Sequence, residues 1–167
     1  MPDRRHTDEP YGFSDRFHGH SIFVSAETSE YKTSLAFARQ IGLQLKAKGL
    51  QYTPHYTEKF MGPRQRQLVD AEAGVYRFDN LAVLRFTNMP AVLLEGGSII
   101  NRDEELRMAN PEHQQLIASA VTTAVENFCK AQGNRKHEPR IRRANNSPAP
   151  TAPAFPFPFA FVGAGQQ

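Results

Sequence analysis

The chain has 167 residues, which suits one domain and is short for two. Hydrophobic residues make up 40% and charged residues 22%, so a core can form and wholesale disorder is excluded. The net charge of +3 is uneven, with −1 on residues 1–130 and +4 on residues 131–167. A basic, nucleic-acid-binding body is therefore excluded as a first interpretation.

Three features that the sequence lacks exclude further classes of protein. A single cysteine, Cys129, excludes an internal disulfide and a cysteine-rich zinc site. No apolar run reaches the roughly 18 residues that a membrane helix needs. Residues 1–10 are polar and lack the apolar core of a signal peptide, so we expect no export signal in this chain.

The first half of the chain predicts one strand and one helix. Residues 1–12 have no pattern and are expected to form an irregular lead-in. The β-branched and aromatic run at residues 21–25 predicts a strand, and apolar residues at helical spacing predict a helix over 30–48. Residues 51–73 are polar and show no period, which indicates a long loop of the kind that often carries function.

The second half predicts two more strands and a long helix. Residues 81–85 and 91–95 are apolar runs, and the second is apolar on both faces, as in a central parallel strand. Asn101 is placed to cap a short helix, and Pro111 begins a helix with an apolar stripe to about residue 130. Strands that alternate with helices predict an α/β fold with a mostly parallel twisted sheet.

The composition changes after residue 130, which predicts a domain boundary. We expect residues 13–130 to form the α/β domain and residues 131–167 to be a basic and then Pro/Ala/Phe-rich disordered tail. The Phe-Pro-Phe-Pro-Phe run at 155–159 could be a docking segment or have no specific role.

Glu95 is the most informative residue for chemistry. It follows four apolar residues and precedes two glycines, so it lies where a buried strand is expected to leave the sheet. Ligands of open α/β sheets bind at the carboxyl ends of the strands, where a partly desolvated carboxylate suits general acid–base catalysis. A carboxylate that only shapes the turn explains the position equally well.

Among the six histidines, only His18 and His20 have a spacing that suggests a metal site. His18 and His20 are one residue apart just before a strand, which could place both imidazoles on one face. No third ligand is evident nearby, and six histidines in the chain make such a spacing unremarkable. We therefore hold His18 and His20 as weak candidates for a metal site.

The stretch LAVLRFTNMPAVLLEGGSIIN at residues 81–101 resembles the zinc-dependent N-acetylmuramoyl-L-alanine amidases. That family carries a VLR run, a PAVLVE run with a following glycine and asparagine, then acidic residues and a closing helix. Here the acidic residues are at 103–105. Residues 19–25 and 34–38 resemble the strand and helix that precede that block, so the match spans roughly residues 13–130.

The resemblance implies a peptidoglycan hydrolase of the cell wall that acts in the periplasm or cell envelope. The family cleaves the amide between the lactyl group of muramic acid and L-alanine. Glu95 occupies the place of the catalytic glutamate, which polarises a zinc-bound water and passes its proton to the leaving amine. Arg85 could contact the substrate or support Glu95, and a structural ion pair explains it equally well.

The match lacks the part of the family domain that holds zinc. In the family, a histidine, a glutamate and a second histidine bind the metal, and all three precede the segment matched here, as do the first strands. Zinc in this chain would need His18, His20 and a residue such as Glu27 or His55. We also expect exposed strand edges near Val24 and Leu93, which favour self-association.

Two other functions remain open at this point. A remnant of an amidase could bind peptidoglycan or a protein partner without cleaving anything, which Glu95→Gln would distinguish from catalysis. The basic tail could instead anchor the chain to an anionic polymer, in which case its binding should weaken as salt rises.

Overall fold

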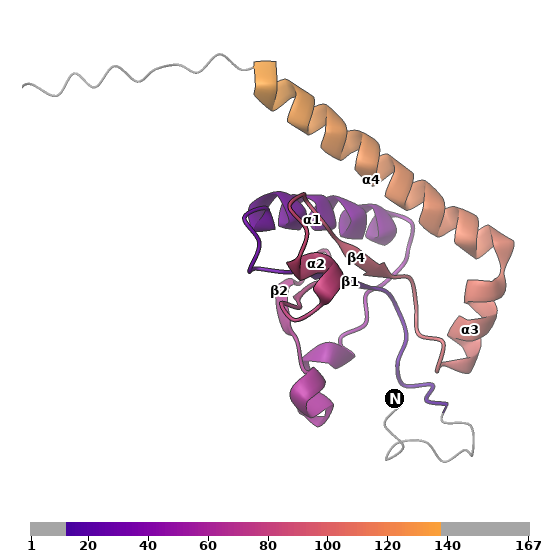
Figure 1. The fold of residues 1–167 in the computed structure, drawn as a ribbon. Coiled ribbons are helices and arrows are strands. Elements are labelled where there is room, and N and C mark those ends of the chain that lie inside the picture. The colour runs from indigo at the N-terminus through magenta and orange to yellow at the C-terminus, as the bar shows by residue number, and fades with distance from the viewer. Residues whose placement is uncertain (1–12, 138–167) are drawn as a thin grey trace, which may run out of the picture. The chain divides into compact units, whose positions relative to one another are not determined.

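The computed structural model describes residues 13–137 (Figure 1). The expected lead-in at 1–12 and most of the expected tail, residues 138–167, lie outside the described residues. The elements are, in order, β1 (Ser21–Val24), α1 (Tyr31–Ala47), η2 (His55–Thr57), η3 (Lys59–Arg64), β2 (Gln67–Asp70), β3 (Val75–Arg77), α2 (Ala82–Arg85), β4 (Leu93–Glu95), α3 (Arg102–Ala109) and α4 (Pro111–His137).

The four strands form a mixed sheet in the order β2-β3-β1-β4. The β1–β3 pair is parallel, whereas the β1–β4 and β2–β3 pairs are antiparallel. The prediction of an α/β fold is confirmed, but the prediction of a mostly parallel sheet is wrong. A short turn joins β2 to β3, which forces those strands to be antiparallel, while α1 provides the crossover that a parallel β1–β3 pair requires.

The apolar runs at residues 81–85 and 91–95 are not two parallel strands. The first contains the short helix α2, with Leu84 buried and Val83 65% exposed. The second contains β4, which pairs antiparallel with β1 and is an outer strand of the described sheet. The expected exposed edge near Val24 is also wrong, because β1 lies between β3 and β4.

The stretch predicted as a loop, residues 51–73, contains regular structure. It includes the 3-10 helices η2 and η3 and the strand β2, and Tyr52 forms an isolated bridge with His20. The strand β3 follows directly after a turn in which the Asp70 carboxylate accepts hydrogen bonds from the backbone N–H groups of Glu72 and Ala73. The segment thereby covers the end of the sheet where β1 begins.

The core has two halves, one on each face of the sheet. Ile22, Val24 and Val75 point to the face where α1 and α4 lie together (Figure 1). Phe23 and Tyr76 alternate with them and point to the opposite face, which Leu84 of α2 helps to cover. This alternation is the period of two that a pleated strand imposes on its side chains.

The predicted helices form close to their expected bounds. The helix α1 ends in a Schellman motif, because Gly49 has a φ of 81° and the N–H of Leu50 donates to the carbonyl of Leu45. The side chain of Asn101 caps α3, as predicted. The helix α4 begins at Pro111 and continues past the predicted boundary at residue 130 to His137.

Candidate active-site cleft

Glu95 ends β4 and lies at the wall of an open cleft of about 400 Å³. Its backbone pairs with Ser21 at the start of β1, so the carboxyl end of β4 meets the amino end of its neighbour. The expected crevice at the carboxyl ends of parallel strands is therefore wrong. The Glu95 side chain is exposed and reaches solvent in the cleft rather than being desolvated by the sheet.

The opposite wall of the cleft comes from the segment around η2 and η3. Tyr56 of η2 donates a hydrogen bond from its hydroxyl to Oε2 of Glu95, at 3.0 Å. His55 lines the same cleft, and its Nδ1 lies 2.6 Å from Oγ1 of Thr53. The rings of Phe17 and Phe60 stack 5.6 Å apart and supply an apolar wall.

Two side chains of the cleft, Tyr56 and His55, have shifted pKa values. Burial, reinforced by the Glu95 carboxylate, raises the pKa of Tyr56, so the phenol keeps its proton. Burial, together with the positive charges of Arg64 and Arg16, lowers the pKa of His55 to about 4. At neutral pH the cleft therefore presents an uncharged His55 imidazole and a Tyr56 phenol that donates a hydrogen bond, beside the side chains of Glu95 and Arg64.

A second carboxylate, Glu104 of α3, holds the strand ends that shape the cleft. Its Oε2 accepts hydrogen bonds from the N–H of Gly19 at 2.9 Å and from the N–H of Ser98 at 3.0 Å. Gly19 precedes β1 and Ser98 follows Glu95. One side chain thus ties together the two backbone segments that meet at Glu95.

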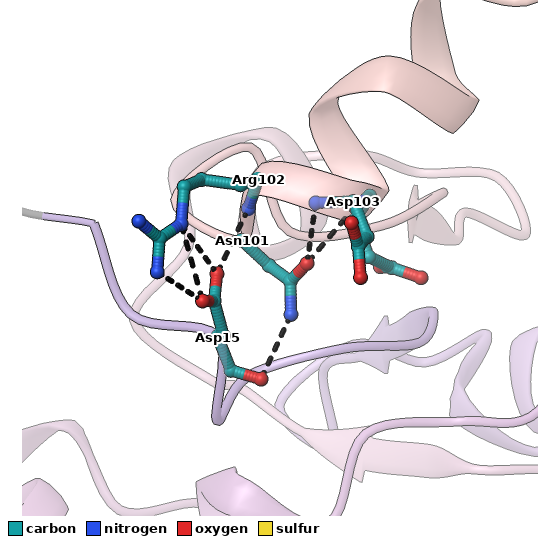
Figure 2. A network of polar contacts seen from close by, with 5 residues as sticks. Asp15, Asn101, Arg102 and Asp103 are labelled. Carbon is teal, nitrogen blue, oxygen red and sulfur yellow. Dashed lines mark hydrogen bonds and ion pairs between the residues drawn. The ribbon is translucent and has the colours of Figure 1, made fainter.

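The segment before β1 is held at the start of α3 by a polar network (Figure 2). Arg102 forms an ion pair with Asp15, and its hydrogen bonds lower the pKa of that carboxyl. The amide of Asn101 donates to the carbonyl of Asp15 at 2.9 Å, while its oxygen caps the N–H groups of Asp103 and Glu104 (Figure 2). The network therefore fastens the segment that leads to Phe17 of the cleft to the start of α3.

Arg85 lies at the other end of β1 from Glu95. Its Nε is 3.2 Å from a carboxylate oxygen of Glu27, three residues beyond the last residue of β1. Glu95 pairs with the first residue of that strand. The ion pair that the sequence left open is therefore made with Glu27, and the structure does not bring Arg85 to Glu95.

The two histidines His18 and His20 share one side of the segment before β1, as their spacing predicts, but it is not the side of Glu95. Phe17 and Ser21 line the Glu95 cleft, whereas His18 and His20 line a neighbouring cavity against α1. His20 is 3% exposed, and burial lowers the pKa of its ring, which favours the neutral form.

The candidate zinc ligands do not come together in this structure. His55 lies in the Glu95 cleft, His18 and His20 face the neighbouring cavity, and Glu27 lies beyond the far end of β1. Among residues 13–137, no group of three His, Cys, Asp or Glu side chains could hold a metal ion. A catalytic zinc needs three protein ligands, so the described residues do not fit one.

Tyr56 and Arg64 were not predicted from the sequence to belong to the site. His55 was considered only as one of two alternatives for a third zinc ligand. All three residues lie in the stretch without hydrophobic period, between the helix α1 and the strand β2. The available signal was an unusually long polar segment that also carries aromatic residues. That signal indicates a functional loop but does not say which strand end it covers.

No helix among the described residues is long and apolar enough to cross a membrane. A comparison with curated proteins finds no match. Among solved structures, the chain is similar to the N-acetylmuramyl-L-alanine amidase of Mycobacterium smegmatis, with a TM-score of 0.59 and 21% identity over 71% of this chain and 50% of that one. The apo form of the Mycobacterium abscessus amidase gives 0.56 and 23% over 70% of this chain and 50% of that one.

A third structure, the CwlD amidase from Clostridioides difficile in complex with the GerS lipoprotein, gives a TM-score of 0.50 and 19% identity over 71% of this chain and 49% of that one. The chain therefore spans about half the length of these solved structures, and at such identities the likeness shows the shared fold. The family model for N-acetylmuramoyl-L-alanine amidase matches residues 6–127. With most of its length matched by that model, this chain belongs to the N-acetylmuramoyl-L-alanine amidase family.

Proposed function

We propose that this chain acts on peptidoglycan in the cell envelope, as an N-acetylmuramoyl-L-alanine amidase with Glu95 as its proton-transfer group. Membership of the family supports the substrate and the bond. The observation that carries the proposal is the exposed Glu95 carboxylate, which lies in the cleft with one oxygen held by Tyr56. The family is generally zinc-dependent, but the described residues do not fit a zinc site.

In this proposal Glu95 moves one proton during amide hydrolysis. The carboxylate takes a proton from the attacking water as the water oxygen bonds to the lactyl carbonyl carbon. It then gives that proton to the nitrogen of L-alanine as the carbon–nitrogen bond breaks. The first products are a lactyl carboxylic acid, which keeps the second proton of the water, and a peptide with a free L-alanine amino group. At neutral pH that second proton passes to the amine, which gives a carboxylate and an ammonium group, so atoms and charges balance.

The first experiment follows hydrolysis of purified, dye-labelled peptidoglycan in buffer that contains zinc. The wild-type chain should release soluble dye, and Glu95→Gln should reduce that release to background because an amide cannot accept the proton. A Glu105→Gln variant is the matched control, since this exposed carboxylate lies on α3 outside the cleft. Equal release by wild type and Glu95→Gln would contradict the role of Glu95.

A second candidate function is binding of peptidoglycan without cleavage. It is favoured by the same absence of a three-ligand metal group among residues 13–137. In that case the wild-type chain should sediment with insoluble peptidoglycan and release no dye, and Glu95→Gln should sediment nearly as well. Dye release that depends on Glu95 would reject this candidate in favour of the amidase.

A further inference from the structure

We propose that Tyr56 is the positioning residue of Glu95: it holds one carboxylate oxygen so that the other faces the cleft for proton transfer. This inference rests on the proposed function for its catalytic meaning. Nothing in the sequence pattern connects the two residues, which are 39 positions apart and come from different walls of the cleft.

The hydrogen bond makes the two oxygens of Glu95 unequal. Tyr56 donates to Oε2 at 3.0 Å, within the ordinary range for a hydroxyl donor. An exposed glutamate otherwise samples several rotamers, and a general base must be aimed to within a fraction of an ångström. A fixed donor on Oε2 restricts the carboxylate to orientations in which Oε1 is left for the substrate.

Tyr56 is itself held in place by aromatic neighbours. Its ring meets Phe23 edge-on at 5.2 Å and Tyr76 at 5.6 Å, and it lies 4.2 Å from the ring of His55. Phe23 and Tyr76 are almost completely buried in the sheet. The donor is therefore anchored to the rigid part of the fold, which suits a group that positions another.

The phenol is also a permanent donor. Burial and the neighbouring carboxylate raise the pKa of Tyr56, so its hydroxyl keeps the proton at neutral pH. Because the phenol keeps its proton, it can donate to Glu95 both before and after proton transfer, with a stronger hydrogen bond to the carboxylate than to the protonated carboxyl. Tyr56 therefore positions Glu95 without exchanging protons with the substrate.

The test combines a spectroscopic and a kinetic readout on the full chain. With tyrosine labelled by ¹³C at Cζ, the Tyr56 resonance, assigned by its loss in Tyr56→Phe, should shift when acid protonates Glu95. Protonation of His55 also affects this ring, so Glu95→Gln is measured alongside, and it should remove the Glu95 part of the shift. Tyr52→Phe is the matched control, because Tyr52 lines the neighbouring cavity rather than the Glu95 cleft.

On peptidoglycan fragments, Tyr56→Phe should lower kcat by about ten- to a hundredfold with KM nearly unchanged, the loss expected for one hydrogen bond to a charged group. Tyr52→Phe should keep the wild-type kcat. An unchanged kcat in Tyr56→Phe, or an identical Tyr56 shift in wild type and Glu95→Gln, would overturn the proposal.

Failure of the proposed function gives a different pattern. If the wild-type chain cleaves nothing, the amidase proposal fails and the positioning role is judged by the Tyr56 resonance alone. A shift that is present in the wild-type chain and lost in Glu95→Gln supports the contact between Tyr56 and the Glu95 carboxyl. An identical shift in the two chains overturns it.

Discussion

Glu104 connects two backbone segments that lie around Glu95. Its Oε2 satisfies two backbone N–H groups, from Gly19 and Ser98, in a partly buried position. A donor left without a partner in such a place costs about 1–3 kcal/mol. We therefore expect Glu104→Ala to lower the free energy of unfolding by about 1–3 kcal/mol, measured by urea denaturation.

Glu105→Ala is the matched control for that prediction. Glu105 is the next residue of α3, is exposed and lies in the same first turn, so its loss tests helix and charge effects alone. The free energy of unfolding of Glu105→Ala should stay within about 0.5 kcal/mol of the wild-type value. Equal losses in the two variants would mean that the Glu104 hydrogen bonds contribute nothing beyond the charge of the helix.

At the residue scale, the sequence proposes Glu95 for the candidate site and gives no sign of Tyr56. Glu95 was predictable because an apolar run, a carboxylate and two glycines are consecutive, so the signal is local. Tyr56 was not, because it reaches Glu95 only after η2 folds over the start of β1, a contact across 39 residues. His18 and His20 shared a face as predicted, but which cavity that face borders depends on the packing of α1.

At the scale of elements, α1 packs closely against the turn before β3, and this contact sets the distance between the helix and the sheet. A Cβ added to Gly42 would lie 2.0 Å from the carbonyl oxygen of Ala73, and 2.7 Å from its Cβ. Gly42→Ala should therefore push α1 away and lower the free energy of unfolding by about 1–3 kcal/mol despite its better helix propensity.

The same substitution at Gly133 of α4 should change the free energy of unfolding in the opposite direction. A Cβ added there meets nothing within 4 Å. Gly133→Ala should therefore raise the free energy of unfolding by about 1 kcal/mol or less through helix propensity alone. Thermal or urea unfolding of both variants checks the pair, and stabilisation by Gly42→Ala would contradict the close packing of α1.

The elements that sequence reasoning predicted correctly are those with local signals. The helix Tyr31–Ala47 has a full apolar stripe and a glycine after its end, and Asn101 is a strong cap. The run at 81–85 was misassigned because four consecutive apolar residues suit a strand or a buried helix turn equally. The strands β2 and β3 are only four and three residues long, and pairing with distant partners defines them.

For the whole molecule, buried histidines make stability depend on pH. Burial lowers the pKa of His55 to about 4 from an ordinary value of 6.5, and it also lowers the pKa of His20. Between about pH 4 and pH 6.5 the unfolded chain binds more protons than the folded chain. The free energy of unfolding therefore rises with pH and falls on acidification. The free energy of unfolding should therefore decrease as the pH is lowered from about 6.5 to 4.

Urea denaturation at several pH values measures this dependence. The variant His55→Gln removes one of the two histidines and should show a shallower slope over the same range. A flat profile for the wild-type chain, or an undiminished slope in His55→Gln, would contradict the assignment of a neutral, partly buried imidazole to the cleft.

Mass spectrometry of a peptidoglycan digest tests most directly whether this chain cleaves the amide between the lactyl group and L-alanine. Purified peptidoglycan is incubated with the wild-type chain or with Glu95→Gln, and the soluble and insoluble fractions are analysed for new ends. We predict peptides with a free L-alanine amino terminus and glycan with free lactyl carboxylates, formed by the wild-type chain alone. Cleavage at another bond, equal cleavage by Glu95→Gln, or no new ends at all would contradict the assignment of amidase activity to this cleft.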